Sequence, residues 1–288
     1  MKNFSTSDPL FSKNLSLNLG GEIMSLSTPR VMGIINATPD SFYEGSRVPA
    51  PEVALEKAGL MIEQGADILD VGAVSSRPGA EELSESDELG RLSPVLEAIR
   101  GAFPAFPLSV DTWRSGVARE VRERFGIHMI NDISAGTLDQ DMFATMAKLE
   151  IPYIMMHMQG TPSSMQDDPA YENVVDEILQ FFAERVYKLR KLGVNDIIID
   201  PGFGFGKTLD QNYKLLSEFD SFRMLELPLM AGISRKSMIY KLLESEPDAA
   251  LNGTTAAHMA VLIKGANILR VHDVAAARET VKIFQQIY

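Results

Sequence analysis

The stretch Asp200-Pro201-Gly202-Phe203-Gly204-Phe205-Gly206-Lys207 directly follows a short apolar run, Ile197-Ile198-Ile199. A β-branched run bounded by turn residues is typical of a strand buried on both faces, as in a parallel sheet. Asp200 is then expected at the carboxyl end of the strand, where a carboxylate needs a polar partner. The three glycines allow positive φ and a close approach to a ligand. The stretch therefore predicts a fixed acceptor, an open loop and a cation, although Asp-Pro-Gly is also ordinary turn and helix-capping chemistry.

Composition and charge narrow the class of protein. The chain has 288 residues, of which 45% are hydrophobic and 23% charged, as in an ordinary globular protein. The net charge of -12 argues against a nucleic-acid surface or an anionic membrane as partner, so any anion site must be a local cluster. The absence of cysteine excludes disulfides, thiolate catalysis and cysteine-bound zinc.

The sequence also predicts the location and the domain organisation. No apolar run is long enough to span a bilayer, and the polar N-terminus lacks the apolar core of a signal peptide, so a cytoplasmic protein is expected. No Pro/Ser-rich linker divides the chain, so we expect one domain over residues 1–288, with residues 1–14 as a flexible arm.

Strand-like and helix-like segments alternate along most of the chain. Alternation on both sides of Gly20-Gly21 predicts a β-hairpin before the main fold. The predicted strands after it are 31–37, 68–73, 108–111, 128–133, 153–157, 197–200, 229–233 and 268–271. Eight such units predict an α/β fold, a (β/α)8 barrel; an open doubly wound sheet is disfavoured because no Gly-x-Gly-x-x-Gly follows the first strand.

The segments between the strands differ in character. Residues 171–192 have apolar residues at helical spacing and predict a core-packing helix. Residues 74–90 and 159–170 are predicted to be long polar loops, of the kind that often form lids. In the last helix, Ala277, Val281 and Phe284 predict an apolar face that packs against either the barrel or a partner.

Polar residues collect where the predicted strands end, which is where barrel active sites lie. They are Asn36, Ser76, Arg77, Asp111, Asn131, Asp132, His157, Asp200, Ser234, Arg235, Lys236, Arg270, His272 and Asp273. The cations and donors suit phosphate or carboxylate groups. Asp111, Asn131 and Asp200 suit a flat heterocycle with amino and ring N–H donors. Together they predict a heterocycle that bears a phosphorylated arm.

Several of the polar residues near the strands also have structural interpretations. Asp70 and Asp132 are candidates for supporting or capping acids, and Arg235 for a surface cation. His128 is expected to be structural, and His157 is left open with packing favoured. Four scattered histidines without His-Glu-x-x-His do not predict a protein-built zinc site.

These motifs resemble those of the dihydropteroate synthases, a family of folate biosynthesis. The matching segments are Met32–Phe42, Ser76–Ala80, Ser109–Thr112, Ile130–Ile133, Met156–Gly160, Asp200–Lys207, Ser234–Ser237 and Arg270–Asp273. The resemblance implies a (β/α)8 barrel, usually a homodimer, that joins 6-hydroxymethyl-7,8-dihydropterin pyrophosphate to p-aminobenzoate and releases pyrophosphate. The family is a sulfonamide target, and the sensitivity of this chain is left open because of Val74 and Ser76.

The resemblance also implies roles for individual residues. Catalysis is implied for Asp111, Asp200, Lys236 and Arg77, and pterin recognition for Asp111, Asn131 and Asp200 with Lys236 beside the ring. Mg²⁺ is implied as a cofactor held with the help of Asn36. Anion contacts are implied for Arg77, Arg270 and His272. The remaining substrate contacts are Ser76, Ser234, Gly232 and Phe205, the last as an apolar wall of the p-aminobenzoate site.

Two loops depart from the common family pattern. The second loop often reads Gly-Glu-Ser-Thr-Arg-Pro-Gly, whereas this chain has Val74 and Ser76 at the Glu and Thr positions. The arylamine pocket is therefore expected to differ in detail. The first loop, Tyr43–Ser46, also varies, and we expect it to close over the substrate.

Three alternatives remain open from the sequence. A pterin-dependent methyltransferase shares the barrel and the pterin acceptors but needs no pyrophosphate site. A class I aldolase would use Lys236 as a Schiff-base amine. A pterin-binding paralogue without turnover would carry Val74 and Ser76 as signs of decay.

Overall fold

The computed structural model describes residues 15–37, 50–74, 83–162, 164–165 and 169–288. The predicted N-terminal arm and the first-loop segment Tyr43–Ser46 lie outside the described residues. The predicted site residues Ser76 and Arg77 also lie outside them.

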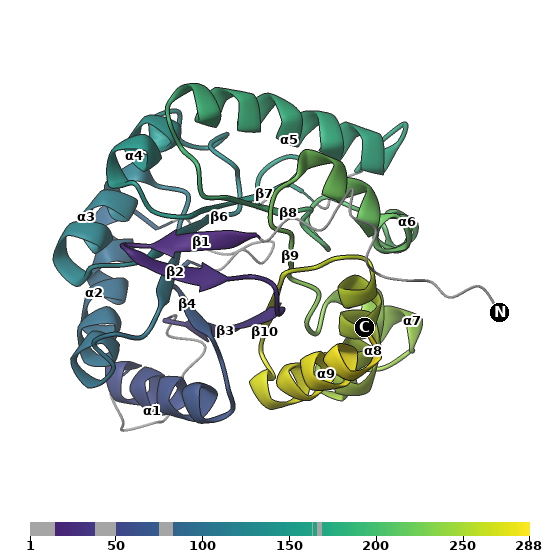
Figure 1. Ribbon diagram of the computed structural model, residues 1–288, viewed down its shortest axis with the longest axis horizontal. Helices are drawn as coiled ribbons and strands as arrows, with labels where there is room; N and C mark the ends of the chain where they lie inside the picture. The colour runs from purple at the N-terminus through teal and green to yellow at the C-terminus, as the bar shows by residue number, and fades with distance from the viewer. Residues whose placement is uncertain (1–14, 38–49, 75–82, 163, 166–168) are drawn as a thin grey trace.

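Eight strands form a parallel sheet that curves into a barrel (Figure 1). The strands are β3 (Arg30–Asn36), β4 (Ile68–Gly72), β5 (Leu108–Asp111), β6 (Met129–Asp132), β7 (Tyr153–Met156), β8 (Ile197–Asp200), β9 (Met230–Ala231) and β10 (Ile268–Val271). Their order is β8-β7-β6-β5-β4-β3-β10-β9, and a parallel bridge from Ile199 to Leu229 joins the two outer strands. The predicted (β/α)8 barrel is confirmed.

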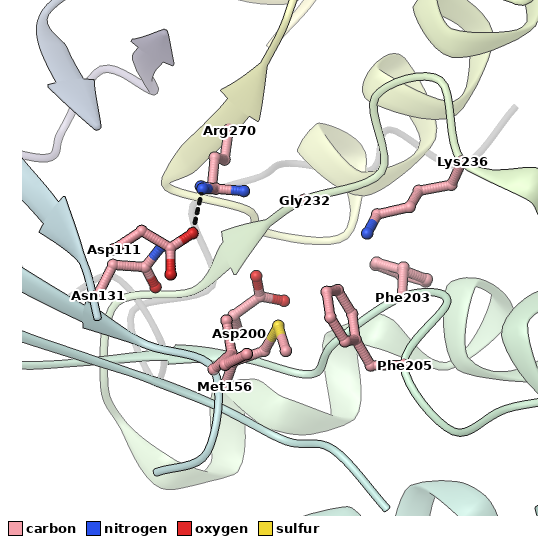
Figure 2. A pocket seen from close by; sticks show the side chains of 10 residues that line it. Asp111, Asn131, Met156, Asp200, Phe203, Phe205, Gly232, Lys236 and Arg270 are labelled. Carbon is pink, nitrogen blue, oxygen red and sulfur yellow. Dashed lines mark hydrogen bonds and ion pairs between the residues drawn. The ribbon is translucent and has the colours of Figure 1, made fainter. Parts of the chain in front are cut away.

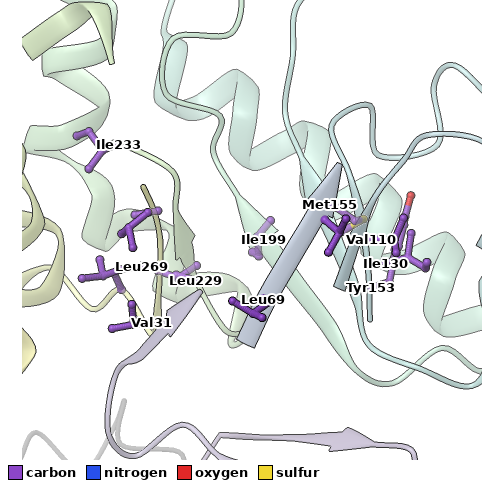
Figure 3. Packing of buried hydrophobic residues seen from close by; sticks show 14 of the residues in the cluster. Val31, Leu69, Val110, Ile130, Tyr153, Met155, Ile199, Leu229, Ile233 and Leu269 are labelled. Atoms are coloured by element: carbon purple, nitrogen blue, oxygen red, sulfur yellow. The ribbon is translucent and has the colours of Figure 1, made fainter. Parts of the chain in front are cut away.

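Helices surround the barrel on its outer side (Figure 1). They are α1 (Ala50–Glu63), α2 (Glu85–Ala102), α3 (Ser115–Phe125), α4 (Met142–Leu149), α5 (Val174–Lys191), α6 (Leu209–Ser217), α7 (Ser237–Leu242), α8 (Leu251–Ile263) and α9 (Val274–Ile287), with short 3-10 helices η2 (Phe219–Leu225) and η3 (Pro247–Ala249). The outward strand side chains pack beneath them, including Val110, Ile130 and Ile199 (Figure 3). None of the described helices is long and apolar enough to cross a membrane.

The predicted helix over residues 171–192 is α5. Asn173 caps it by accepting a hydrogen bond from the backbone N–H of Val175 at 3.2 Å. Ile178, Phe182 and Leu189 are fully buried, so the apolar stripe is core packing, as expected.

The predicted loop over residues 74–90 ends earlier than expected, because residues 85–90 belong to α2. Ser84 Oγ accepts a hydrogen bond from the backbone N–H of Asp87 at 3.1 Å and so begins the helix. The acids Glu85, Asp87 and Glu88 occupy the first turn, where they complement the helix dipole. The polar residues that suggested a loop are thus a helix N-terminus.

The N-terminal hairpin closes one end of the barrel. Strands β1 (Ser16–Leu19) and β2 (Glu22–Ser25) are antiparallel, as predicted. Leu17 and Leu19 are buried, and they join an interior cluster that also contains Leu26, Met32, Ile68, Met129, Ile154, Ile198, Met230 and Ile268. The hairpin is therefore an apolar floor beneath the strands.

The last helix packs against the barrel. In α9, Ala277 and Val281 are fully buried, and Phe284 is partly buried against the same core. Of the two interpretations of this face, packing against the barrel is confirmed. Other side chains of α9, such as Ile283 and Ile287, are 56% and 62% exposed.

Candidate active site

A pocket opens inside the barrel at the carboxyl ends of the strands (Figure 2). It is lined by Asp111, Asn131, Ile133, Met156, Asp200, Phe203, Phe205, Gly232, Lys236 and Arg270. The lining residues that the sequence analysis predicted are Asp111, Asn131, Asp200, Phe205, Gly232, Lys236 and Arg270. The fold therefore brings together side chains that are distant in sequence.

Asp200 lies at the centre of the pocket (Figure 2). It is 3% exposed, and its Oδ1 accepts a hydrogen bond from the backbone N–H of Gly202 at 2.8 Å. Burial raises the pKa of Asp200, whereas the Gly202 hydrogen bond and the nearby cations Lys236 and Arg270 lower it. Gly232 leaves room beside the carboxylate, because a Cβ there would lie 3.3 Å from Asp200 Oδ2.

The glycine loop after Asp200 has the positive φ angles that the sequence predicts. Gly202 and Gly206 have φ of 75° and 61°. A Cβ on Gly202 would lie 2.0 Å from the carbonyl oxygen of His157, and one on Gly206 would lie 2.7 Å from that of Gln159. These two glycines thus allow a close approach to the backbone that follows β7, and not to a ligand as expected.

Lys207 does not face the pocket, so its prediction as the cation of this loop is wrong. The side chain is 4% exposed. Its Nζ donates to the carbonyl oxygens of Gly202 and Phe205, each at 2.9 Å, and lies 3.1 Å from His157 Nδ1. Burial lowers the pKa of Lys207 to about 7. Through these contacts Lys207 instead stabilises the loop that carries Phe205.

Arg270 joins two acids of the barrel interior. Its Nε donates to Asp70 Oδ2 and its Nη2 donates to Asp111 Oδ2, both at 2.7 Å. Burial raises the pKa of Asp111 to about 7; Arg270 opposes this rise, and the charges of Asp70, Glu88 and Asp132 add to it. The pocket therefore holds an acceptor that gains its negative charge near neutral pH.

Lys236 and Phe205 form one wall of the pocket (Figure 2). Lys236 Nζ lies 4.2 Å from the centroid of the Phe205 ring, which is within the range of a cation–π contact. Burial and Arg270 lower the pKa of Lys236 to about 8, against the opposing effect of Asp200 and Asp111. This wall offers an apolar ring face and a cation to a flat ligand.

Three predicted site residues lie outside the lining of this pocket. Ser234 is buried, and its Oγ accepts a hydrogen bond from the backbone N–H of His272 at 3.2 Å. Burial lowers the pKa of His272 to about 4, with further lowering from Lys57 and Arg270, so its imidazole is neutral at pH 7. Asn36 is exposed at the end of β3.

The structural interpretations of Asp132, His157 and His128 are confirmed. Asp132 points away from the pocket, and its carboxylate accepts from the hydroxyl groups of Tyr153 and Ser134. His157 packs edge-on against Phe181 with ring centroids 4.7 Å apart. His128 Nδ1 accepts a hydrogen bond from the backbone N–H of Leu108.

The structure adds a partner for one predicted cation and two lining residues that the sequence analysis did not predict. Arg235 is a partly exposed cation, as expected, and it is held in place because its Nε and Nη2 donate to the two oxygens of Asp273, each at 2.8 Å. Met156 and Phe203 line the pocket but were not predicted. The alternation of β7 could have indicated Met156, since inward Ile154 implies that Met156 also faces inward.

The pocket and its rim contain few residues for holding a metal. No group of three or more His, Asp or Glu side chains among the described residues could hold an ion. Asn36 offers one amide oxygen. Because Mg²⁺ often binds through one or two protein oxygens together with substrate phosphates and water, Asn36 suits a shared site and not a protein-built cage.

The fold and the pocket together define a class of protein. A barrel with buried acceptors and two cations at the carboxyl ends of its strands is an enzyme-type site for a flat heterocycle with N–H donors. The model of a family described as pterin binding enzymes matches residues 32–272. The chain is 41% identical over 273 residues to dihydropteroate synthase of Haemophilus influenzae, covering 94% of this chain and 98% of that protein.

Solved structures agree with this class. Dihydropteroate synthase of Xanthomonas albilineans with 4-aminobenzoic acid has a TM-score of 0.89 and 39% identity, covering 96% of this chain and 98% of that one. The Yersinia pestis enzyme in a sulfonamide drug complex has a TM-score of 0.88 and 40% identity, covering 95% and 99%. This chain belongs to the pterin binding enzymes and, among them, to the dihydropteroate synthases, so the resemblance noted in the sequence is confirmed.

Proposed function

We propose that this chain joins 6-hydroxymethyl-7,8-dihydropterin pyrophosphate to p-aminobenzoate, giving 7,8-dihydropteroate and pyrophosphate. The observation that carries the proposal is the convergence of Asp111, Asn131 and Asp200 beside Lys236 and Arg270 in one pocket. The acceptors suit the amino and ring N–H groups of a pterin, and the cations suit its anionic arm.

Within this proposal, the acids recognise the pterin ring. The oxygens of Asp200 and Asp111 would accept hydrogen bonds from its N–H groups, and Asn131 would contribute an amide. The ring would lie near Phe205 and Lys236, where an apolar face and a cation are side by side. Charged acceptors in a water-poor pocket give strong hydrogen bonds, so recognition is expected to depend steeply on both acids.

The reaction itself exchanges one bond for another. The bond between the exocyclic carbon and the pyrophosphate oxygen breaks, and pyrophosphate leaves with the electron pair. The amine of p-aminobenzoate forms the new C–N bond and loses one proton to solvent. We propose that departure precedes attack, with Asp111 and Asp200 stabilising the positive charge that develops on the pterin. An arylamine is already a nucleophile, so no strong general base is required.

The pyrophosphate arm is assigned to the rim of the barrel. His272 and Arg270 are the described donors there, and Arg77 lies outside the described residues. Asn36 would contribute an oxygen ligand to Mg²⁺, which when bound neutralises charge on the leaving group. Removal of divalent ions by EDTA is expected to slow product formation, and added Mg²⁺ to restore it.

The p-aminobenzoate site is assigned to the mouth of the pocket. Phe205 would form its apolar wall, and the buried Ser234 hydroxyl would lie near its polar end. Ser76 lies outside the described residues and is assigned to this site by its sequence motif alone. We infer that a sulfonamide would compete with p-aminobenzoate here. Inhibition by a sulfonamide that p-aminobenzoate does not relieve would contradict this assignment.

The first test of the function is pyrophosphate release from the dihydropterin substrate with Mg²⁺, with and without p-aminobenzoate. We expect release that depends on the arylamine and yields dihydropteroate. Tight pterin binding without release would instead favour a binding paralogue or a methyltransferase. Trapping of a carbonyl substrate on Lys236 by borohydride would favour the aldolase alternative.

We also propose that the chain forms a homodimer in the cytoplasm. Helices α8 and α9 expose Ile263, Ile283 and Ile287 by 50%, 56% and 62%, and these apolar side chains would be covered by a second copy. Analytical ultracentrifugation is expected to give twice the chain mass, and Ile287→Glu to give a monomer. Fractionation of cells is the test of the location.

A further inference from the structure

Asp70 is a buried acid that does not line the pocket. It lies on β4, is 0% exposed, and is paired in register with Ser109 of β5. The same register pairs Gly72 with Asp111, so Asp70 lies one inward position below Asp111. An ionised carboxylate at such depth is unfavourable unless donors compensate it.

One oxygen of Asp70 holds two residues of the pocket. Asp70 Oδ2 accepts from Arg270 Nε at 2.7 Å and from Asn131 Nδ2 at 3.0 Å. Arg270 in turn donates from Nη2 to Asp111 Oδ2 at 2.7 Å, the contact drawn in Figure 2. Asp70 therefore connects, directly or through one guanidinium, to three residues that line the pocket.

These contacts fix the orientation of the Asn131 amide. An ionised carboxylate only accepts hydrogen bonds, so the Asn131 nitrogen must face Asp70 and its oxygen must face elsewhere. A flipped amide would bring two oxygens together. The Arg270 guanidinium is likewise held between two carboxylates, which restricts its plane.

The other oxygen of Asp70 shows that this arrangement is not one that stability alone would favour. Asp70 Oδ1 has no hydrogen-bond partner in the part of the chain that the structure describes, and the same holds for the buried Ser109 Oγ. Leaving a buried acceptor unsatisfied costs about 1–3 kcal/mol. Glu88 is buried with one unpartnered oxygen in the same way, so what distinguishes Asp70 is its direct contact with Asn131 and Arg270, which line the pocket.

We propose that Asp70 is a positioning residue for the pterin half of the site, which orients the Asn131 amide directly and the Asp111 carboxylate through Arg270. The inference rests on the proposed function, because it assigns Asp70 to the recognition of the same substrate. Asp70 acts on the pterin side only, since among the described residues its hydrogen bonds go to Asn131 and Arg270 and not to the wall formed by Phe205 and Lys236.

The test is Asp70→Asn, which preserves the volume and removes the charge. Calorimetry with dihydropterin pyrophosphate is expected to show roughly 10- to 100-fold weaker binding, since removing one partner of a buried charged pair is strongly unfavourable. The KM for p-aminobenzoate is expected to change less than about twofold. Unchanged binding of the pterin by a folded Asp70→Asn protein would overturn the inference.

A pH profile separates positioning from a purely structural role. Burial is the largest cause that raises the pKa of Asp111. The charged groups that shift it further are Arg270 of β10, which lowers it, and Asp70 of β4, Glu88 of α2 and Asp132 of β6, which raise it. Asp70→Asn should therefore move the acidic limb of pterin binding to lower pH. A change in thermal stability without this movement would count against the inference.

Glu88→Gln is the matched control. Glu88 is also 0% exposed, with one oxygen paired to Arg114 and Oε1 without a partner among the described residues. Neither Glu88 nor Arg114 lines the pocket. Glu88→Gln is expected to alter stability as Asp70→Asn does. Because the charge of Glu88 also raises the pKa of Asp111, pterin affinity is compared on the alkaline side of the acidic limb, where it should change less than about twofold. An equal loss of affinity in both variants would overturn the specific role of Asp70.

A second pair of variants covers the case in which Asp70→Asn alone does not fold. Arg270→Gln is compared with the double variant Asp70→Asn/Arg270→Gln, in which the charge of Asp70 is removed together with that of its guanidinium partner. The double variant is expected to bind the pterin several-fold more weakly than Arg270→Gln alone, because the Asn131 amide also loses its contact with the Asp70 carboxylate. Equal affinity would overturn the inference, whereas an unmodified protein that binds pterin but makes no dihydropteroate would overturn the proposed function instead.

Discussion

The two ends of the barrel interior are built from the same strands and differ in chemistry. Towards the hairpin, the inward side chains include Met129, Ile198 and Ile268, which are fully buried in an apolar cluster. Two residues further along the same strands, the inward side chains are Asn131, Asp200 and Arg270, which line the pocket. A separation of about 7 Å along each strand thus divides an apolar floor from a polar site.

This difference shows how one sheet can serve stability and recognition separately. Each large apolar side chain of the floor contributes about 1.5–3 kcal/mol by leaving water. Burial of the acids above the floor is unfavourable instead. It disfavours the charged forms of Asp111 and Asp200 and so raises their pKa values. Substitutions in the apolar floor should therefore lower mainly the free energy of unfolding, and substitutions in the pocket should lower mainly the activity.

The largest effect is expected at the polar end, from Asp200→Asn. It removes a charged acceptor at the centre of the pocket, and a hydrogen bond to a charged group contributes about 1.5–3 kcal/mol. With two such bonds, about 3–6 kcal/mol in all, kcat/KM for dihydropterin pyrophosphate should fall about 10²- to 10⁴-fold, measured by pyrophosphate release. The free energy of unfolding in urea should not fall by more than about 1 kcal/mol. A large loss of stability with activity retained would break the comparison.

The corresponding change at the apolar end is Ile198→Ala. Truncating a buried Ile should lower the free energy of unfolding by about 2–4 kcal/mol, because it loses burial and leaves a cavity. Activity per folded molecule at 25 °C should stay within about threefold. Urea denaturation and steady-state assay of the same preparation would measure both; an activity loss as large as that of Asp200→Asn would show that the two ends are not separable.

Asp111→Asn tests the electrostatic part of the comparison. The pKa of Asp111 is about 7 in the folded chain, above the ordinary value of 3.8, so the folded state holds its proton more tightly. The contribution of Asp111 to the free energy of unfolding is therefore fully present below pH 4 and is lost as the pH rises to about 7. The variant lacks this loss, so its free energy of unfolding should rise relative to that of the unmodified chain between pH 4 and 8, by up to about 4 kcal/mol for a pKa that rises from 3.8 to about 7 on folding. Its pterin affinity should fall sharply. Urea unfolding at several pH values would measure the difference, and parallel curves or unchanged pterin binding would reject the assignment.

The smallest effect is expected far from both ends. Lys214 and Glu218 form an exposed i,i+4 pair on α6 at 2.7 Å. Such pairs contribute about 0.3–0.5 kcal/mol, so Lys214→Gln should change neither stability nor activity beyond that range. A larger change would indicate that substitution in general, and not position within the barrel, explains the other effects.

The sequence predicted the barrel well, because strands buried on both faces leave an unmistakable apolar run. The run 197–199 and the following Asp200 correctly indicated both a strand and its carboxyl end. The first turn of α2 was missed because Glu85 and Glu88 look like loop residues unless Ser84 is recognised as the N-cap. Local composition therefore predicts strand interiors better than helix starts.

The sequence predicted several of the residues that line the site but not which residues contact one another. Asp111, Asn131 and Asp200 were expected at one rim, and they do line one pocket. The bond from Arg270 to Asp70 joins residues that are 200 apart in sequence, and it depends on the register of the closed barrel. Lys207 was misassigned because its burial depends on how the loop folds back beside His157. Such pairings follow from tertiary geometry, which no local pattern contains.

The floor formed by Leu17 and Leu19 also bears on the order of kinetic events. With the hairpin closing one end of the barrel, the pocket is a chamber approached from its opposite end. Under the proposed function, the pterin occupies the deeper acceptors and the arylamine the mouth, so the pterin must enter first. Initial-rate plots should accordingly follow an ordered sequential pattern, with p-aminobenzoate as the second substrate to bind.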